Sequence, residues 1–155
     1  MSKNEPYKAK LPIGVGVGFK TDHFEEILDN PGDLAWVEIH AENYMGLGGR
    51  PLAQLQNLAD IYPVSCHGVG LSIGGETPLD RDHLNRLKLL VSWLNPAQFS
   101  EHLAWSSHGQ NFYNDLLPVP YNRATAGRVI SHINQVQDHL NTTMLLENPL
   151  KLSGV

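Results

Sequence analysis

The sequence predicts an α/β protein whose parallel strands are joined by helices. Three observations carry this prediction: short apolar runs alternate with amphipathic segments, turn residues precede the runs, and His or Glu ends four consecutive runs. Strands that alternate with helices pair in parallel through right-handed crossovers. Two architectures have this order, an open doubly wound sheet and part of a (β/α)8 barrel. Both gather their chemistry at the carboxyl ends of the strands.

Three strands are predicted in the first half of the chain. Residues 13–19 form a short apolar run broken by glycines, and Thr21 is the predicted N-cap of the helix that follows. Residues 35–40, AWVEIH, form the second predicted strand. Pro51 fits the first turn of the next helix, where its missing N–H is not needed. Residues 63–67 form the third strand.

The second half of the chain repeats the same alternation. Asp80 is a predicted cap for a helix whose leucines recur at helical spacing, and residues 98–102 form the fourth strand. A long amphipathic pattern predicts a helix over about 124–140, and residues 144–147 form the fifth strand. The complete order is therefore β-α-β-α-β-α-β-α-β.

Composition predicts one globular domain over residues 1–155, with a polar tail at 1–11. Apolar residues make up 41% of the chain and charged residues 17%. The net charge is −5 and the basic residues are scattered, so we expect no nucleic-acid partner. No apolar run has the roughly 20 residues that span a bilayer, so we expect no membrane partner. The single Cys66 and the lack of a signal-peptide pattern favour a cytoplasmic location.

Polar side chains at the predicted strand ends form the candidate site. His67 ends the third strand, His102 ends the fourth and Glu147 ends the fifth. Imidazole and carboxylate groups suit iron, manganese or zinc, so we predict that these three residues are metal ligands. A single His at a strand end is more often a hydrogen-bonded structural residue, and the convergence of three ends favours a metal. His40 is open to either a supporting or a ligand role.

The other histidines and the cysteine have simpler interpretations. Four histidines lie on predicted helices and are expected at the surface: His23, His83, His132 and His139. His108 is expected in a plain loop. Cys66 precedes His67 on a strand, so the two side chains point to opposite faces and Cys66 is expected to be a buried structural thiol. Gly14, Gly16 and Gly18 do not complete a dinucleotide-binding fingerprint, because Phe19 stands where its third glycine is required.

Six long segments carry a resemblance to a known family: GVGVGFKTDHFEEIL, WVEIHAENYMGLGG, YPVSCHGVGLSIGG, FSEHLAWSSHG, NDLLPVPY and LLENP. They resemble the N-terminal half of the multinuclear non-haem iron-dependent oxidative enzymes, a bacterial family long described as a domain of unknown function. The similarity extends from about Ile13 to Pro149. It implies the first five strands of a TIM (β/α)8 barrel.

The resemblance also implies a chemistry. Members of the family bind two or three irons and use dioxygen to modify cysteine residues of ribosomally made precursor peptides, some with a small partner protein that presents the peptide. By position, His67, His102 and Glu147 match metal ligands, with Glu147 in the place of a carboxylate that bridges two irons. Further residues are assigned to the pocket wall or to a supporting layer: His40, Glu42, Asn43, Glu101, Trp105 and Asn114.

Chain length departs from this family pattern. A (β/α)8 barrel takes about 250 residues, whereas this chain has 155 and ends in an atypical segment at 150–155. We therefore expect a truncated form with at most a partial iron site, inactive alone, that forms homo-oligomers through open sheet edges. Two alternatives stay open: a non-catalytic half-barrel remnant, and a zinc- or manganese-dependent hydrolase or isomerase on a similar barrel.

Overall fold

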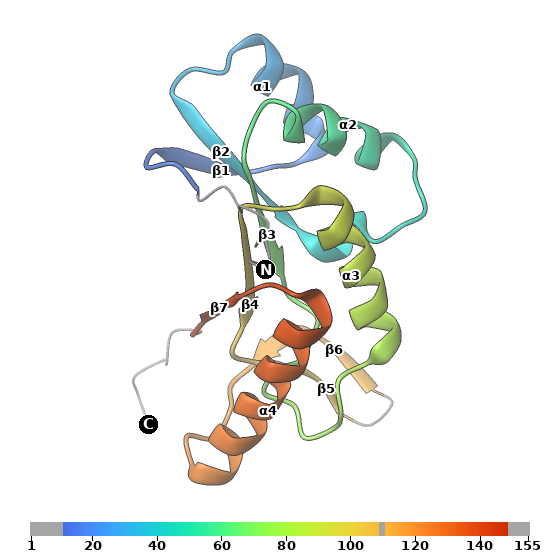
Figure 1. The fold of residues 1–155 in the computed structure, drawn as a ribbon, viewed down its shortest axis with the longest axis vertical. Helices are drawn as coiled ribbons and strands as arrows, with labels where there is room; N and C mark the ends of the chain where they lie inside the picture. The colour runs from blue at the N-terminus through green and yellow to red at the C-terminus, as the bar shows by residue number, and fades with distance from the viewer. Residues whose placement is uncertain (1–10, 109–110, 149–155) are drawn as a thin grey trace, which may run out of the picture.

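A computed structural model describes residues 11–108 and 111–148 of the chain (Figure 1). Its main sheet has five strands, all parallel, in the spatial order β1-β2-β3-β4-β7. The bounds are Val15–Gly18 for β1, Leu34–His40 for β2, Val64–Gly68 for β3, Gln98–His102 for β4 and Met144–Glu147 for β7. All five predicted strands are therefore confirmed, with ends that differ by a few residues.

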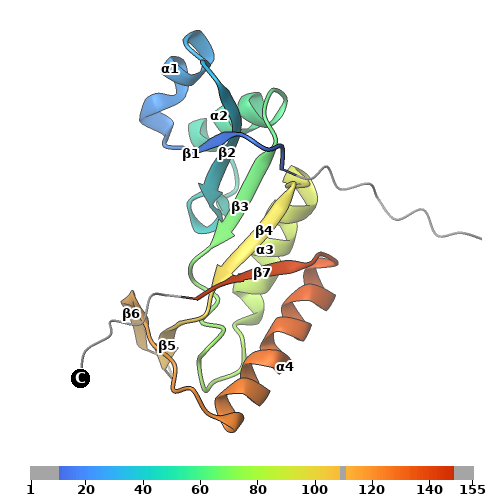
Figure 2. The ribbon, with the colours of Figure 1, turned by 90° about the vertical axis from the view of Figure 1, so that its left-hand side faces the viewer.

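Four helices and two short 3₁₀ turns connect the strands. The helices are α1 at Phe24–Asp29, α2 at Arg50–Ala59, α3 at Arg81–Leu94 and α4 at Arg123–Leu140. The 3₁₀ turns lie at Thr21–His23 and Ala41–Tyr44. Figure 2 shows α2, α3 and α4 behind the sheet, so one face carries these helices and the other is open.

The strand order decides between the two predicted architectures. Sequential strands lie side by side and their helices cover one face, whereas a doubly wound sheet reverses its order and carries helices on both faces. The fold is thus a singly wound α/β sheet, consistent with part of a (β/α)8 barrel. The five described strands form an open sheet with β1 and β7 at its edges.

Helix termini follow the sequence at two of the three predicted positions. Asp80 caps α3, because its carboxylate accepts hydrogen bonds from the backbone N–H groups of Asp82 and His83. Pro51 lies in the first turn of α2, as its fixed φ favours. The predicted cap Thr21 is wrong, because Thr21 begins a 3₁₀ turn and makes no side-chain cap.

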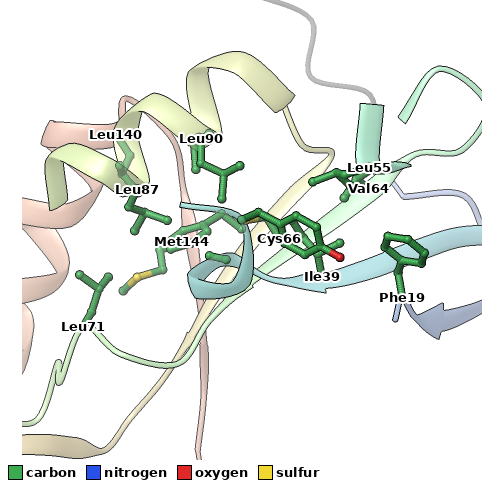
Figure 3. Packing of buried hydrophobic residues seen from close by; sticks show 14 of the residues in the cluster. Phe19, Ile39, Leu55, Val64, Cys66, Leu71, Leu87, Leu90, Leu140 and Met144 are labelled. Atoms are coloured by element: carbon green, nitrogen blue, oxygen red, sulfur yellow. The ribbon is translucent and has the colours of Figure 1, made fainter. Parts of the chain in front are cut away.

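The hydrophobic core lies between the sheet and its helices (Figure 3). Every second residue of a strand faces the helices, as do Ile39 of β2 and its register partner Cys66 of β3. These side chains lie among Leu87 and Leu90 of α3 and Leu55 of α2. Cys66 is fully buried, and burial raises the pKa of its thiol to about 12. The prediction of a buried thiol on the helix side is confirmed.

An antiparallel hairpin follows β4 and was not predicted from the sequence. Its strands are β5 at Trp105–His108 and β6 at Asn111–Leu117. The indole N–H of Trp105 donates to the carbonyl of Pro118 at 2.9 Å, which fixes the hairpin base. The expectation that His108 lies in a plain loop is wrong, because His108 is the last residue of β5. Strand β5 has only four residues and β6 is largely exposed, so neither shows the apolar alternation of a core strand.

Three of the four helical histidines are at least partly buried, so the expectation of surface positions is wrong for them. One of the three is His139 of α4, whose Nε2 is buried. His132 of α4 is buried, and its Nδ1 lies 2.9 Å from the carbonyl oxygen of Ile73. His83 of α3 is only partly exposed and lies beside Glu42. His132 therefore provides a partner for a backbone carbonyl of the loop after β3, whereas His83 pairs with the carboxylate of Glu42.

Among the helices within residues 11–108 and 111–148, none combines the length and the apolar character that a bilayer span requires.

Candidate metal centre

Three side chains from neighbouring strands converge at the carboxyl edge of the sheet. His67 comes from β3, His102 from β4 and Glu147 from β7. His102 and Glu147 are register partners across the β4–β7 pair. His67 lies on the face opposite to that of Cys66, because successive strand residues alternate. The fold therefore brings the three residues predicted as ligands to one place.

The potential donor atoms are close to one another. Each side chain offers one donor atom, and these three atoms all lie within 4.8 Å of one another. Nε2 of His67 lies 2.9 Å from Nε2 of His102 and 3.7 Å from Oε2 of Glu147. Nδ1 of His102 lies 3.9 Å from Oε1 of Glu147. Two nitrogens and a carboxylate at this spacing match the ligand chemistry of zinc, manganese or iron.

The electrostatics of the cluster favour neutral imidazole. Burial is the largest cause that lowers the pKa of His67, and the neighbouring His102 lowers it further. A neutral imidazole carries the lone pair that a metal requires. Nδ1 of His102 is buried and makes no hydrogen bond among the described residues. The side chain of Glu147 is more than half exposed, so the cluster opens toward solvent on that side.

A polar layer on the open face of the sheet supports the cluster. The Oγ of Ser100 lies 2.8 Å from Nδ1 of His67, and both residues are buried. The hydroxyl of Ser65 donates to the carboxylate of Glu38 at 2.9 Å. His40 is exposed, and its ring centre lies 5.7 Å from that of His67. His40 is thus a neighbour of the cluster rather than one of its three converging donors.

Glu42 lies in a separate cavity of about 770 Å³ between the loops after β2 and β3. Its Oε1 accepts hydrogen bonds from the backbone N–H groups of Val69 and Gly70, at 3.0 and 2.8 Å. Nε2 of His83 lies 3.4 Å from the same oxygen. Burial opposes ionisation of Glu42, but His83 and the two backbone N–H groups outweigh it and lower its pKa.

Glu101 lies on the helix side of β4 and is 1% exposed. Burial raises the pKa of its carboxyl group to about 8, and the negative charge of Glu42 adds to the rise. Backbone N–H groups of His102 and Leu71 donate to the carboxylate at 2.9 and 3.4 Å and offset part of this effect. Glu101 and His102 are consecutive on a strand, so they face opposite sides of the sheet.

The remaining residues assigned to the pocket wall lie outside the cluster. Asn43 and Asn114 are exposed. Trp105 lines a second cavity of about 430 Å³ with Tyr113 and Arg128. The rings of Trp105 and Tyr113 meet edge to face, with centres 5.9 Å apart.

Sequence reasoning did not single out three residues that surround the site. The period of two along β4 places Ser100 on the same face as His102, and this signal could have identified it. The same period along β2 and β3 places Glu38 and Ser65 near His40 and His67. No local signal pairs His83 with Glu42, because 41 residues separate them and only the fold brings them together.

Comparison with known proteins gives a consistent set of matches. A family model described as RiPP precursor modification enzyme MbnB/TglH/ChrH matches residues 14–153. A UPF0276 protein of Paraburkholderia phytofirmans is 51% identical over 142 residues, which is 92% of this chain and 46% of that protein. A UPF0276 protein of Rhizobium meliloti is 51% identical over 135 residues, covering 86% of this chain and 44% of the relative. A UPF0276 protein of Bordetella pertussis is 48% identical over 139 residues, which is 90% of this chain and 48% of that protein. The chain spans about half the length of these relatives.

Proposed function

The chain belongs to the MbnB/TglH/ChrH family of RiPP precursor modification enzymes, and from this premise we propose that His67, His102 and Glu147 hold iron for the oxidative modification of a peptide. RiPPs are ribosomally synthesised peptides that enzymes modify after translation, so the family indicates a peptide substrate. The observation that carries the proposal is the convergence of the three side chains from β3, β4 and β7.

The donor set fits a redox-active metal. Two imidazoles and one carboxylate are the ligand types found at non-haem iron sites with open positions. His67 is poised in its neutral form, and the buried Nδ1 of His102 makes no hydrogen bond among the described residues. Iron bound there would supply a centre that takes a cysteine thiolate and dioxygen side by side. The open side at Glu147 gives a peptide access to it.

The protein side of the chemistry is positioning and exclusion of water. Rigid strands hold His67 and His102, and both are largely buried. The Glu42 cavity lies among loops at the same carboxyl edge, so we propose that it receives residues beside the modified cysteine. Its ionised Glu42 would favour a basic or amide-rich stretch of peptide. A small partner protein that presents the precursor is also proposed.

Self-association belongs to the same proposal. Val15 and Leu145, on the edge strands β1 and β7, are 62% and 50% exposed. Exposed apolar edge strands favour pairing with other strands. We propose that the 155-residue chain forms homo-oligomers, which light scattering after size-exclusion chromatography measures directly. A monodisperse monomer at micromolar concentration would contradict this part of the proposal.

Metal content tests the central claim. The chain is loaded with Fe(II) without oxygen, desalted, and assayed for iron, zinc and manganese by mass spectrometry. His67→Ala and His102→Ala should each remove most of the bound iron, whereas the control His23→Ala should not, because His23 is exposed on a separate turn. Iron that stays bound in both variants contradicts the assignment. Preferential binding of zinc or manganese favours the hydrolase or isomerase alternative.

Turnover tests the reaction. The iron-loaded chain is given dioxygen and a cysteine-containing precursor peptide, with and without a partner protein, and peptide masses are followed. The three donors found among the described residues would hold a single metal ion at an edge that is open to solvent. They match only part of the two- or three-iron centre that the family resemblance implies. We therefore expect little or no turnover by the chain alone. Many cycles per chain would show that the 155-residue chain suffices for the reaction.

A further inference from the structure

A buried hydroxyl faces the proposed metal site from within the sheet. Ser100 is 8% exposed, and its Oγ lies 2.8 Å from Nδ1 of His67, which is 6% exposed. The two residues are register partners in the parallel pair β3–β4. Ser100 is also two residues before His102, so both side chains point to the open face. One strand thus carries both a proposed ligand and a group that contacts the other histidine.

We propose that Ser100 is a positioning residue, whose hydroxyl accepts a hydrogen bond from Nδ1–H of His67 and leaves Nε2 free for a metal. A neutral imidazole carries one proton, and the partner of one ring nitrogen decides which nitrogen holds it. Nε2 is the atom that faces the cluster, at 2.9 Å from Nε2 of His102 and 3.7 Å from Glu147. The inference rests on the proposed function, because it concerns a ligand of that site.

The surroundings leave Ser100 as the group that can set this tautomer. The nearby hydroxyl of Ser65 is engaged with the carboxylate of Glu38 at 2.9 Å. His40 approaches His67 by ring contact, with planes inclined at 56°. Strand register places the Cβ of Ser100 opposite His67, and in the observed rotamer its hydroxyl lies within hydrogen-bond distance of Nδ1. Such partners orient metal-binding histidines, and their loss costs about 10- to 100-fold in metal affinity.

The experiment compares the affinity of four metal-free proteins for Zn(II) and, without oxygen, for Fe(II). They are the wild type, Ser100→Ala, Ser100→Thr and Ser106→Ala. Ser100→Ala should bind about 10- to 100-fold more weakly, and Ser100→Thr, which keeps the hydroxyl, should regain most of the loss. Ser106→Ala is the matched control, because Ser106 is buried and its hydroxyl makes no hydrogen bond among the described residues. Its affinity should equal that of the wild type.

A spectroscopic readout separates orientation from general damage. Long-range ¹H–¹⁵N spectra of the zinc-loaded wild type should show the proton of His67 on Nδ1 and the metal on Nε2. Ligation through Nδ1 overturns the inference, as does wild-type affinity in Ser100→Ala. An equal loss in Ser106→Ala and Ser100→Ala also overturns it, since any buried hydroxyl would then serve. If the wild type binds neither ion, the proposed function fails and the inference fails with it. Tight wild-type binding that Ser100→Ala leaves unchanged defeats the inference alone.

Discussion

Nε2 of His67 and Nε2 of His102 lie 2.9 Å apart, although 35 residues separate them along the chain. Their rings meet edge to face with centres 4.6 Å apart. Adjacent parallel strands hold both residues, so the pair is set by strand register and not by a flexible loop. Because two imidazolium ions at this distance repel each other, the pair favours at least one neutral ring.

Metal affinity should depend on pH in a direction that follows from His67. Its pKa lies below the ordinary 6.5, because burial and His102 disfavour its charged form. A metal competes with protons for this nitrogen. Protons therefore do not compete with the metal for His67 above pH 6.5. They begin to compete only as the pH falls through the lowered pKa of His67. Zn(II) titrations from pH 5 to 8 should show a plateau at the alkaline end. A steep loss of affinity between pH 8 and 7 would contradict the assignment of His67.

Stability of the metal-free protein should fall as the pH rises through the range in which Glu101 ionises. Its pKa is about 8 in the fold against a usual 4.5, so between these values the folded state holds a proton that the unfolded state has lost. Glu101→Gln removes this penalty. The free energy of unfolding of the variant, measured in urea, should therefore rise relative to that of the wild type between pH 5 and 9, by on the order of a few kcal/mol.

The control for Glu101 is Glu25→Gln, because Glu25 is exposed on α1. This variant should keep the pH profile of the wild type. Parallel profiles for Glu101→Gln and the wild type would show that Glu101 does not carry a raised pKa.

Gly74 should resist substitution. A Cβ at this position would overlap Cγ1 of Val119 and would lie 3.0 Å from the carbonyl oxygen of Ala104. The backbone at Ala104 cannot easily withdraw, because this carbonyl accepts the N–H of Gly74 at 2.8 Å. Gly74→Ala should lower the free energy of unfolding by about 1–3 kcal/mol.

Gly127 provides a comparison of opposite sign. It lies inside α4, and a Cβ there meets nothing within 4 Å. Gly127→Ala should stabilise the protein by about 0.5–1 kcal/mol, because alanine loses less backbone entropy in a helix. Equal effects of the two substitutions in urea unfolding would refute the packing argument at Gly74.

Cys66 should react slowly with thiol reagents in the folded protein. It is fully buried, and its pKa of about 12 leaves almost no thiolate at neutral pH. Labelling at pH 8 should be negligible in buffer and should reach one thiol per chain in concentrated urea. The urea sample serves as the control for reagent activity. Rapid labelling in buffer would place Cys66 on an accessible surface.

The sequence by itself determined the five strands of the main sheet and the residues at their carboxyl ends. Apolar runs and helical spacing predicted the five parallel strands, and the alternation of Cys66 and His67 predicted which of the two side chains faces the helices. These features depend on neighbours within a few positions, so local pattern carries them. The strand ends at His67, His102 and Glu147 were predicted for the same reason.

Tertiary structure alone decided which of these residues meet. The strand order shows a singly wound sheet and not a doubly wound one. The sequence could not decide between them, because both architectures have the same alternation of strands and helices along the chain. The hairpin strand β6 was not predicted, because it is largely exposed and has no buried face that would require apolar and polar residues to alternate. Register across β3 and β4 placed Ser100 against His67, and loop packing placed His83 against Glu42. Contacts between residues far apart in sequence depend on how whole elements pack, and no local spacing encodes that choice.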